Sequence, residues 1–261
     1  MIEDVIFASY GNDSIALIQW AVESGEVLPG ETMIVHSDTG WAAESWAERV
    51  EQASAWARSL GFRTTAIPSM GMRALVSMKK GWPRQGMQFC TEHLKIKPAL
   101  QWLDENDPER DVTCLVGVRR VESRARAQWP EWIESSERHG GRSLWSPLVR
   151  HTDEMRDALV SRTPFDVLPH RSQECFPCVN SNRDDLRQLT PERVAEIAAL
   201  ESALGYTSKG KPRTMFRPYR HQGATGIREV WRWAKSERGK YRQLVMLGDG
   251  VGCDSGMCGE G

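Results

Sequence analysis

Short apolar runs alternate with longer amphipathic stretches along much of the chain. The run VIFA at residues 5–8 is continuously apolar, as expected for a strand buried on both faces of a sheet. Over residues 41–61, apolar side chains recur at helical spacing and Gly61 ends the pattern. Further strands are predicted at residues 32–40, 62–67 and 111–118. This alternation predicts an α/β fold with a mostly parallel sheet and right-handed crossovers.

The remaining segments are mainly helical or irregular. A helix over residues 91–106 is expected to be broken at Pro98. Residues 119–150 are rich in Arg, Trp and Pro and are expected to be irregular. Further helices are predicted from about Thr152, over 190–205 and over 227–238. We therefore expect an α/β domain over residues 1–150 and a C-terminal helical and loop region over 151–261, whose cysteine-containing tail packs on the active site.

Composition excludes little. The 261 residues carry a formal net charge of -1, so the overall charge does not indicate a polyanion-binding protein. No apolar run approaches the roughly 20 residues of a membrane span, so no membrane association is expected. The N-terminus, MIEDVIFASY, is acidic and enters a strand directly, unlike a signal peptide. We expect a cytoplasmic protein.

A polar turn with one glycine, SYGNDS at residues 9–14, follows the first strand. Gly11 would let the backbone approach an anion, and Ser9, Ser14 and the amides of the following helix could donate hydrogen bonds to phosphate oxygens. The turn lacks the Gly-Lys pair and the Ser or Thr that end a P-loop. Alone, this pattern is more often a simple helix cap than a phosphate site.

Two more polar motifs follow later strands. Ser37, Asp38, Thr39 and Gly40 end the second strand. The segment GVRRVESRARAQW at residues 117–129 follows the strand at 111–118 and carries arginines suited to a polyphosphate or sulfonate: Arg119, Arg120, Arg124 and Arg126. Singly, these are an ordinary turn and a solvated charged face. Because ligands of open parallel sheets bind beyond the carboxyl ends of the strands, the motifs together predict a nucleotide site.

Six cysteines suggest a second kind of chemistry. They are Cys90, Cys114, Cys175, Cys178, Cys253 and Cys258. In a reducing compartment such a set is metal-binding, catalytic or buried rather than disulfide-bonded. Cys114 lies inside a predicted strand and is expected in the core. Cys175 and Cys178 form a C-x₂-C pair, and four thiolates from separate segments could hold either a [4Fe–4S] cluster or a structural zinc.

These motifs resemble those of a known family. Ser9-x-Gly11-x-Asp13-Ser14 resembles the PP-loop of N-type ATP pyrophosphatases. The segments HSDTGW, FCTEHLKIKP and GVRRVES resemble successive motifs of the phosphoadenosine phosphosulfate (PAPS) reductase family. The segment ECFPCVNSNRDDLRQLTPERVAEIAALE is similar to the C-terminal part of a bacterial and phage branch, which includes proteins similar to DNA phosphorothioation sulfurtransferases. The resemblance implies an adenine nucleotide α-hydrolase-like three-layer sandwich.

The resemblance also implies a nucleotide site for ATP, or for PAPS or adenylyl sulfate, with Mg²⁺ near Asp38. Many ATP-using PP-loops carry lysine where Asn12 stands, so positive charge would have to come from Lys95, Lys97 or the arginines at 119–126. The implied nucleotide-binding residues are Ser9, Tyr10, Gly11, Asn12, Ser14, Ser37, Asp38, Thr39, Gly40, Lys95, Lys97, Gly117, Arg119, Arg120, Glu122 and Ser123.

Two departures favour ATP over PAPS. Sulfonucleotide reductases usually lose the Asp-Ser pair that this chain keeps as Asp13 and Ser14. They also end in a Glu-Cys-Gly-Leu-His segment, which is absent here. Both differences favour a protein that splits ATP to adenylate a substrate.

The resemblance places Cys90, Cys175 and Cys178 where relatives hold a [4Fe–4S] cluster, with zinc as the alternative metal. Some relatives use a Cys-Cys pair at the first position, where this chain has Phe89. Cys253 or Cys258 would then supply the fourth ligand, leaving the other as a reactive thiol. Alternatively, the cluster has three protein ligands and one open iron.

Three functions follow as hypotheses. The first is an adenylating sulfurtransferase, with Asp13, Ser14, Asp38, Cys253 and Cys258 as catalytic residues and a sulfur donor such as a cysteine desulfurase. The second is a sulfonucleotide reductase that forms sulfite with thioredoxin. The third is a non-catalytic subunit of a nucleic-acid modification complex. The basic, aromatic segment at 207–222 suits a nucleic-acid substrate or a solvated loop equally, and a homodimer is possible.

Overall fold

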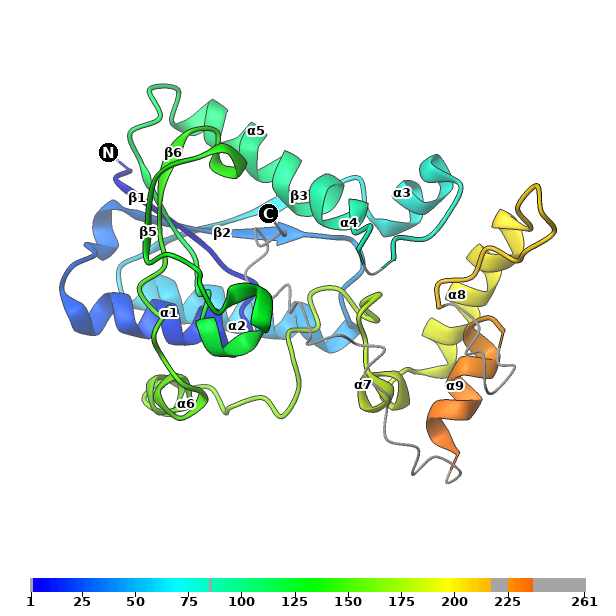
Figure 1. Cartoon of the computed structure of the whole chain (residues 1–261). Helices are drawn as coiled ribbons and strands as arrows, with labels where there is room; N and C mark the ends of the chain where they lie inside the picture. Colours follow the sequence, from blue (N-terminus) through cyan, green and yellow to red (C-terminus); the bar gives the residue numbers. More distant parts are fainter. Residues whose placement is uncertain (1, 85, 217–224, 237–261) are drawn as a thin grey trace.

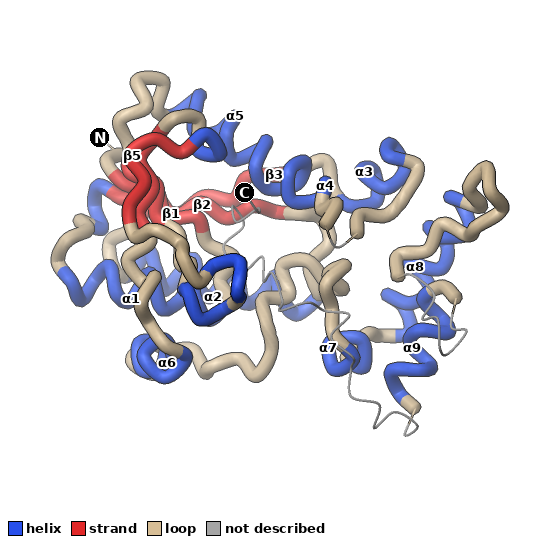
Figure 2. Tube along the Cα trace, viewed as in Figure 1, coloured by secondary structure: helices blue, strands red, loops and turns tan. Residues whose placement is uncertain are grey.

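The computed structural model describes residues 2–84, 86–216 and 225–236. Within these residues, six strands form one sheet in the order β3-β2-β1-β4-β6-β5 (Figures 1 and 2). The strands are β1 (Asp4–Phe7), β2 (Thr32–Asp38), β3 (Arg63–Pro68), β4 (Thr113–Leu115), β5 (Trp132–Ser136) and β6 (Arg142–Trp145). All neighbouring pairs are parallel except β5 and β6, so an antiparallel strand forms one edge.

Helices cover both faces of this sheet (Figure 1). The helices of the sandwich are α1 (Asn12–Ser24), α2 (Glu44–Ser59), α3 (Met72–Lys79), α4 (Phe89–Thr91), α5 (Lys97–Asn106) and α6 (Asp153–Val160), with a π-helical turn at Glu92–Ile96 between α4 and α5. Helices α1, α2 and α6 share a core with one face of the sheet, and α5 packs on the other face. The expected three-layer α/β sandwich is confirmed.

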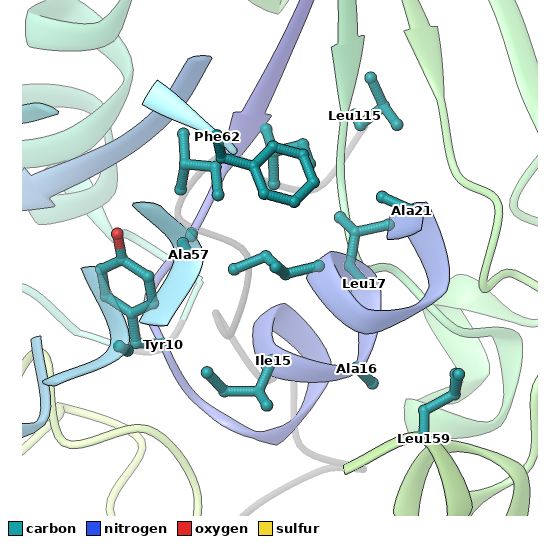
Figure 3. Close-up of a cluster of buried hydrophobic side chains, with 14 of the residues drawn as sticks. Tyr10, Ile15, Ala16, Leu17, Ala21, Ala57, Phe62, Leu115 and Leu159 are labelled. Atoms are coloured by element: carbon teal, nitrogen blue, oxygen red, sulfur yellow. The ribbon is translucent and has the colours of Figure 1, made fainter. Parts of the chain in front are cut away.

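Strand β1 shows why both faces are covered. Ile6 enters the core beneath α1 and α2, whereas its neighbours Val5 and Phe7 enter the core beneath α5. A strand whose alternate side chains are apolar on both faces gains most from helices on each side. Figure 3 shows the first of these cores, in which Tyr10 and Phe62 lie with the apolar face of α1.

Three further helices form a group beside the sandwich: α7 (Arg183–Arg187), α8 (Pro191–Leu204) and α9 (Ile227–Lys235) (Figure 1). Their apolar side chains share a core with α3 and with Trp41 and Trp82. Helix α6, which follows residue 150, packs instead on α1, so the segment after 150 contributes to both parts. In the described part of the chain, no helix is both long and apolar enough to cross a membrane.

Most predicted elements are confirmed within a few residues, but the segment 119–150 was wrongly expected to be irregular. It forms the β5–β6 hairpin that completes the sheet. The helix after Thr152 begins as expected, because the Thr152 hydroxyl accepts a hydrogen bond from the backbone amide of Met155. Pro98 does not end the helical run; it lies in the first turn of α5, directly after the π-helical turn at Glu92–Ile96, where the regular α-helical hydrogen-bond pattern is already displaced.

The hairpin is fixed at its far end by a buried charged group. Arg142 is fully buried, and its Nε donates to Asp107 Oδ2 at 2.5 Å. Its Nη1 donates to the backbone carbonyl of His139 at 3.1 Å. His139 is buried against the ring of Phe7, and its Nδ1 lies 2.7 Å from the hydroxyl of Ser136. Burial, together with the smaller effect of the nearby Arg138 and Arg142, lowers the pKa of His139 to about 4.

This depressed pKa predicts acid sensitivity. Folded His139 stays neutral down to about pH 4, whereas the unfolded side chain takes up a proton near pH 6.5. Stability conferred by the neutral ring is therefore present above pH 6.5 and is lost as the pH falls toward 4, by about 2–3 kcal/mol. Urea unfolding of the wild type and of His139→Asn at several pH values measures this. A difference between the two proteins that stays constant from pH 7 to 4 would contradict the assignment.

Candidate nucleotide and thiol site

Residues 9–14, which we call the PP-loop, form hydrogen bonds among themselves at the start of α1. The hydroxyls of Ser9 and Ser14 lie 3.2 Å apart, and both residues are buried. The backbone amide of Ser9 donates to Ser14 Oγ at 3.0 Å, and the amide of Gly11 donates to Ser9 Oγ at 3.3 Å. Helix α1 begins at the next residue, Asn12. The two hydroxyls thus gather at the positive end of a helix dipole, where an anion is stabilised.

Tyr10 faces the core from this loop. Its backbone is left-handed, with a φ of 60°, and its side chain is fully buried. The ring lies 5.5 Å from the ring of His36, and its hydroxyl accepts a hydrogen bond from Ser54 at 3.0 Å. Burial raises the pKa of Tyr10. The side chain that the resemblance assigned to the nucleotide instead anchors the loop in the core shown in Figure 3.

Arg119 holds the PP-loop from the tip of β4. Its Nε lies 2.5 Å from Asp13 Oδ1, and its Nη2 lies 2.9 Å from Asp153 Oδ1. Asp13 and Arg119 are both buried. Burial lowers the pKa of Arg119, but the adjacent Asp13 carboxylate more than offsets this and the pKa is raised. Sequence reasoning predicted Arg119 as a phosphate ligand, whereas this geometry joins two strand tips.

The other polar groups of the GVRRVES motif also bond to neighbouring groups of the protein. The carboxylate of Glu122 accepts from the backbone amide of Arg119 at 2.6 Å and forms an ion pair with Arg126. The Ser123 hydroxyl accepts from the backbone amide of Arg126 at 3.3 Å. Arg120 Nε donates to the carbonyl of Trp129 at 2.8 Å. The motif is therefore a compact turn whose charges are used within the protein.

The turn after β2 binds the C-x₂-C segment. The Thr39 hydroxyl donates to the carbonyl of Glu174 at 2.7 Å. The indole of Trp41 donates to the carbonyl of Pro177 at 3.2 Å, and the amide of Phe176 donates to the carbonyl of Trp41 at 2.8 Å. These bonds join residues more than 130 positions apart in the chain. The motif predicted to bind nucleotide thus also positions the cysteine pair.

Other residues of this turn differ in exposure. Ser37 is buried, whereas Asp38 is exposed and its Oδ1 accepts from the Gly40 amide at 2.8 Å. Gly40 has a φ of 59°, and a Cβ there would lie 3.1 Å from the backbone of Gly71. The turn therefore needs glycine, and it leaves the Asp38 carboxylate facing solvent.

A buried ion pair joins the turn before α5 to the C-x₂-C segment. Lys95 Nζ lies 2.5 Å from Glu174 Oε2, and both side chains are less than a tenth exposed. His36 Nδ1 lies 4.0 Å from the other carboxylate oxygen of Glu174. Lys97, the second predicted lysine, is exposed and pairs with Glu92 at 3.6 Å.

A pocket lies between these elements. Three cysteines line it, together with hydroxyl, charged, amide and aliphatic side chains. The lining residues are Thr39, Gln88, Cys90, Thr91, Leu94, Lys95, Arg171, Ser172, Glu174, Cys175, Cys178 and Val179. We call it the thiol pocket. Burial raises the pKa of the Cys175 thiol well above its ordinary value, and the neighbouring Cys178 and Cys90 thiols raise it further. The structure thus brings together three of the predicted metal ligands.

The other cysteines are elsewhere. Cys253 and Cys258 lie outside the described residues. Cys114 is fully buried in β4, as predicted, and burial raises the pKa of its thiol to about 12. Among the residues described, no group of three or more His, Cys, Asp or Glu side chains is placed to hold a metal ion.

The sequence did not predict that residues 168–174 would pack on the PP-loop. The Asn12 amide nitrogen donates to the carbonyl of Leu168 at 3.0 Å, and its oxygen accepts from the amide of Leu168 at 2.9 Å. A Cβ at Gly11 would lie 3.1 Å from Cβ of Ser172. We call residues 168–174 the strap. It carries Glu174, Arg171 and Ser172 into the pocket wall; the position of Glu174 beside the C-x₂-C pair was the one signal in the sequence.

Gly117 provides a test of this packing. A Cβ at Gly117 would lie 3.0 Å from the carbonyl oxygen of Asp13, so we expect Gly117→Ala to lower the free energy of unfolding by about 1–3 kcal/mol. Gly30→Ala is the matched control, because nothing lies within 4 Å of a Cβ at that position. Urea unfolding of both variants measures the difference. Equal stability of the two variants would show that the strand tip and the PP-loop are not tightly packed.

The chain is similar in sequence to a known protein family. The sequence model of the phosphoadenosine phosphosulfate reductase domain matches residues 3–202. The crystal structure of the phosphoadenylyl-sulfate (PAPS) reductase from Candida auris, in its phosphate complex, is similar with a TM-score of 0.44 and 14% sequence identity, covering 63% of this chain and 74% of that one. No curated protein matches the sequence significantly. Because the family model spans most of the chain, the protein belongs to the phosphoadenosine phosphosulfate reductase family.

Proposed function

We propose that the protein binds an adenine nucleotide between the PP-loop and the thiol pocket, and that it splits ATP to adenylate a substrate for sulfur transfer. One observation carries this proposal. Ser172 packs on Gly11 of the PP-loop and also lines the pocket that contains Cys90, Cys175 and Cys178. A phosphate-binding loop and a set of thiols therefore adjoin the same strap. Adenylation followed by attack of sulfur needs these two chemistries side by side.

The reaction proceeds in two displacements. An oxygen of the substrate attacks the α-phosphorus of ATP, the bond to the β-phosphate oxygen breaks, and pyrophosphate leaves. The hydroxyls of Ser9 and Ser14 and the first amides of α1 stabilise the charge on the phosphates. A sulfur nucleophile delivered by a donor then attacks the substrate atom that bears the adenylated oxygen, the bond between that atom and the oxygen breaks, and AMP leaves with the electron pair.

The carboxylates have different roles in this proposal. Asp38 is exposed at the tip of β2 and is the residue we propose for Mg²⁺ or the nucleotide. Asp13 is buried in its ion pair with Arg119, so we assign it the positioning of Ser14 rather than contact with the reacting atoms. Cys253 and Cys258 are proposed as the thiols that complete the site.

The three pocket cysteines are proposed ligands of a [4Fe–4S] cluster, with zinc as the alternative. Burial, and then the neighbouring Cys178 and Cys90 thiols, raise the pKa of the Cys175 thiol, as expected for a set that gains by binding a cation. Their thiol chemistry suits a cluster, but within the described residues they are not placed to hold a metal ion, so the proposal requires them to draw together on binding, with Cys253 or Cys258 as the fourth ligand. A bound cluster would keep these thiols deprotonated and would place iron-bound sulfur beside the nucleotide.

A second candidate function is reduction of PAPS or adenylyl sulfate. Membership of the PAPS reductase family favours an enzyme of the sulfonucleotide reduction type, and thiols line the pocket next to the PP-loop. In this reaction a cysteine thiolate attacks the sulfate sulfur and the nucleotide leaves. A thioredoxin-type dithiol then reduces the S-sulfocysteine and releases sulfite. The lowered thiol pKa that this step requires would have to come from a nearby cation or from iron.

Loss of the Ser14 hydroxyl should impair ATP cleavage. We expect Ser14→Ala to reduce pyrophosphate release from ATP by about tenfold or more, because a hydrogen bond to a charged oxygen is lost. Ser59→Ala is the control, since Ser59 is exposed at the end of α2 and donates only to the carbonyl of Trp56. The assay measures pyrophosphate with and without nucleic acid as acceptor. Sulfite formation from PAPS with thioredoxin, without pyrophosphate release from ATP, would instead establish the reductase.

The cluster proposal is tested by metal content. Anaerobic reconstitution with iron and sulfide should give a protein with bound iron, acid-labile sulfide and visible absorbance. Cys178→Ser should lose most of this content, whereas Cys114→Ala should retain it, because Cys114 is buried in β4 away from the pocket. A protein that takes up only zinc, or equal iron in both variants, would contradict the proposal.

A further inference from the structure

We propose that Arg171 binds the anionic end of the nucleotide at the thiol pocket and replaces the lysine that this PP-loop lacks. The proposal rests on the proposed function, since it presumes a nucleotide in this site. Its ligand is a phosphate or sulfate group, the chemistry that ATP and PAPS share. Arg171 lies on the strap and lines the pocket together with the three cysteines.

The residue at the lysine position is committed elsewhere. Both polar atoms of the Asn12 side chain bond to the backbone of Leu168, at 3.0 and 2.9 Å. An amide that satisfies both the backbone N–H and the backbone C=O of one residue holds that residue as a neighbouring strand would, and it contributes no charge. The Asn12 side chain therefore attaches the strap to the PP-loop and is not available to contact a ligand. The same attachment brings Arg171, three residues further along, to the pocket.

The other predicted cations are bound to partners within the protein. Lys95 pairs with Glu174 at 2.5 Å in a buried setting, and Arg119 pairs with Asp13 at 2.5 Å. Arg120 is outside the pocket wall and donates to a backbone carbonyl. Withdrawing Lys95 would separate the buried Glu174 carboxylate from its close counter-charge, and withdrawing Arg119 would remove the closer cation from Asp13, which Arg156 approaches only to 4.0 Å; both changes are unfavourable.

Arg171 differs in the looseness of its ion pair. Its Nε lies 3.8 Å from Asp185 Oδ2, beyond the range of a direct hydrogen bond. That oxygen already accepts the amide of Asn182 at 2.8 Å, as part of the cap of α7. The guanidinium side chain is 29% exposed, so it can reorient at low cost. A guanidinium with parallel N–H groups suits two oxygens of a phosphate or sulfate.

The position of the strap fits this role. Ser172 contacts Gly11 of the PP-loop, and Glu174 pairs with Lys95 in the pocket. Arg171 is therefore held between a phosphate loop on one side and the thiols on the other. A nucleotide whose phosphates rest on the PP-loop would direct its next anionic group toward Arg171.

The test compares two arginine substitutions in the full-length protein. Binding of ATP, of PAPS and of inorganic phosphate is measured by calorimetry for the wild type, Arg171→Gln and Arg171→Lys. Arg162→Gln is the control, because Arg162 pairs with Glu23 on the surface at 2.7 Å. We expect Arg171→Gln to weaken binding of the nucleotide used by the protein by about tenfold or more, with a smaller loss for Arg171→Lys and none for the control. The nucleotide that shows the loss identifies the source of the anion.

The outcomes separate this inference from the function on which it rests. Wild-type binding of neither nucleotide would overturn the proposed function. Nucleotide binding that is equally tight in Arg171→Gln and the wild type would overturn the role of Arg171 alone. Should Arg171→Gln fail to fold, labelling of wild-type arginines with a dicarbonyl reagent decides the matter. Saturating nucleotide should protect Arg171 and leave Arg162 reactive; unchanged labelling of Arg171 would refute the proposal.

Discussion

The site depends on the buried ion pair between Lys95 and Glu174. Removing two charges from water costs several kcal/mol per ion, and close geometry with further hydrogen bonds is needed to offset that cost. Here the charged atoms are 2.5 Å apart, and the backbone of Glu174 is held by Thr39 at 2.7 Å. Separating the pair would strand two buried charges. The turn that carries Cys90 and the segment that carries Cys175 are therefore kept together, although they are far apart in the sequence.

The same principle governs the phosphate loop. Asp13 and Arg119 neutralise each other in the core of the sandwich, and Asp153 binds the far side of the guanidinium. Three segments, the PP-loop, the tip of β4 and the start of α6, are joined by these charges. Side chains whose ion pairs stabilise the fold in this way are poorly suited to bind a ligand instead. This is why we propose that the cationic partner of a nucleotide comes from the strap rather than from the strand tips.

Local patterns made the first part of the sheet predictable. The strands β1, β2 and β3 and the helices between them have apolar spacing that depends only on neighbouring residues. The β5–β6 hairpin was missed because β5 is a short edge strand with mostly solvent-exposed side chains, and β6 begins with a buried arginine. An arginine is read as a surface residue unless its partner is known, and Asp107 lies 35 positions away.

The candidate site was predictable in its residues but not in their partners. The structure places Ser9 beside Ser14 at the start of α1 and the three cysteines in the wall of one pocket; their assignment to a nucleotide and a metal stays a prediction. The contacts of Asn12 and the placement of Arg171 in the pocket wall could not be deduced, because Asn12 bonds to a backbone 156 positions away and a backbone acceptor leaves no trace in residue type.

This distinction changes the meaning of the Asp-Ser pair in the PP-loop. From the sequence, its presence favoured ATP over PAPS as the substrate. In the structure Asp13 is an internal partner of Arg119, and a Cβ at Gly117 would lie only 3.0 Å from its carbonyl oxygen. The presence of Asp13 therefore reflects how this loop is attached to the sheet and does not identify the substrate. Ser14 alone keeps a hydroxyl beside that of Ser9 at the start of α1, so the case for a bound triphosphate rests on Ser14. The distinction between the two substrates then depends on the group that meets the strap and the thiols.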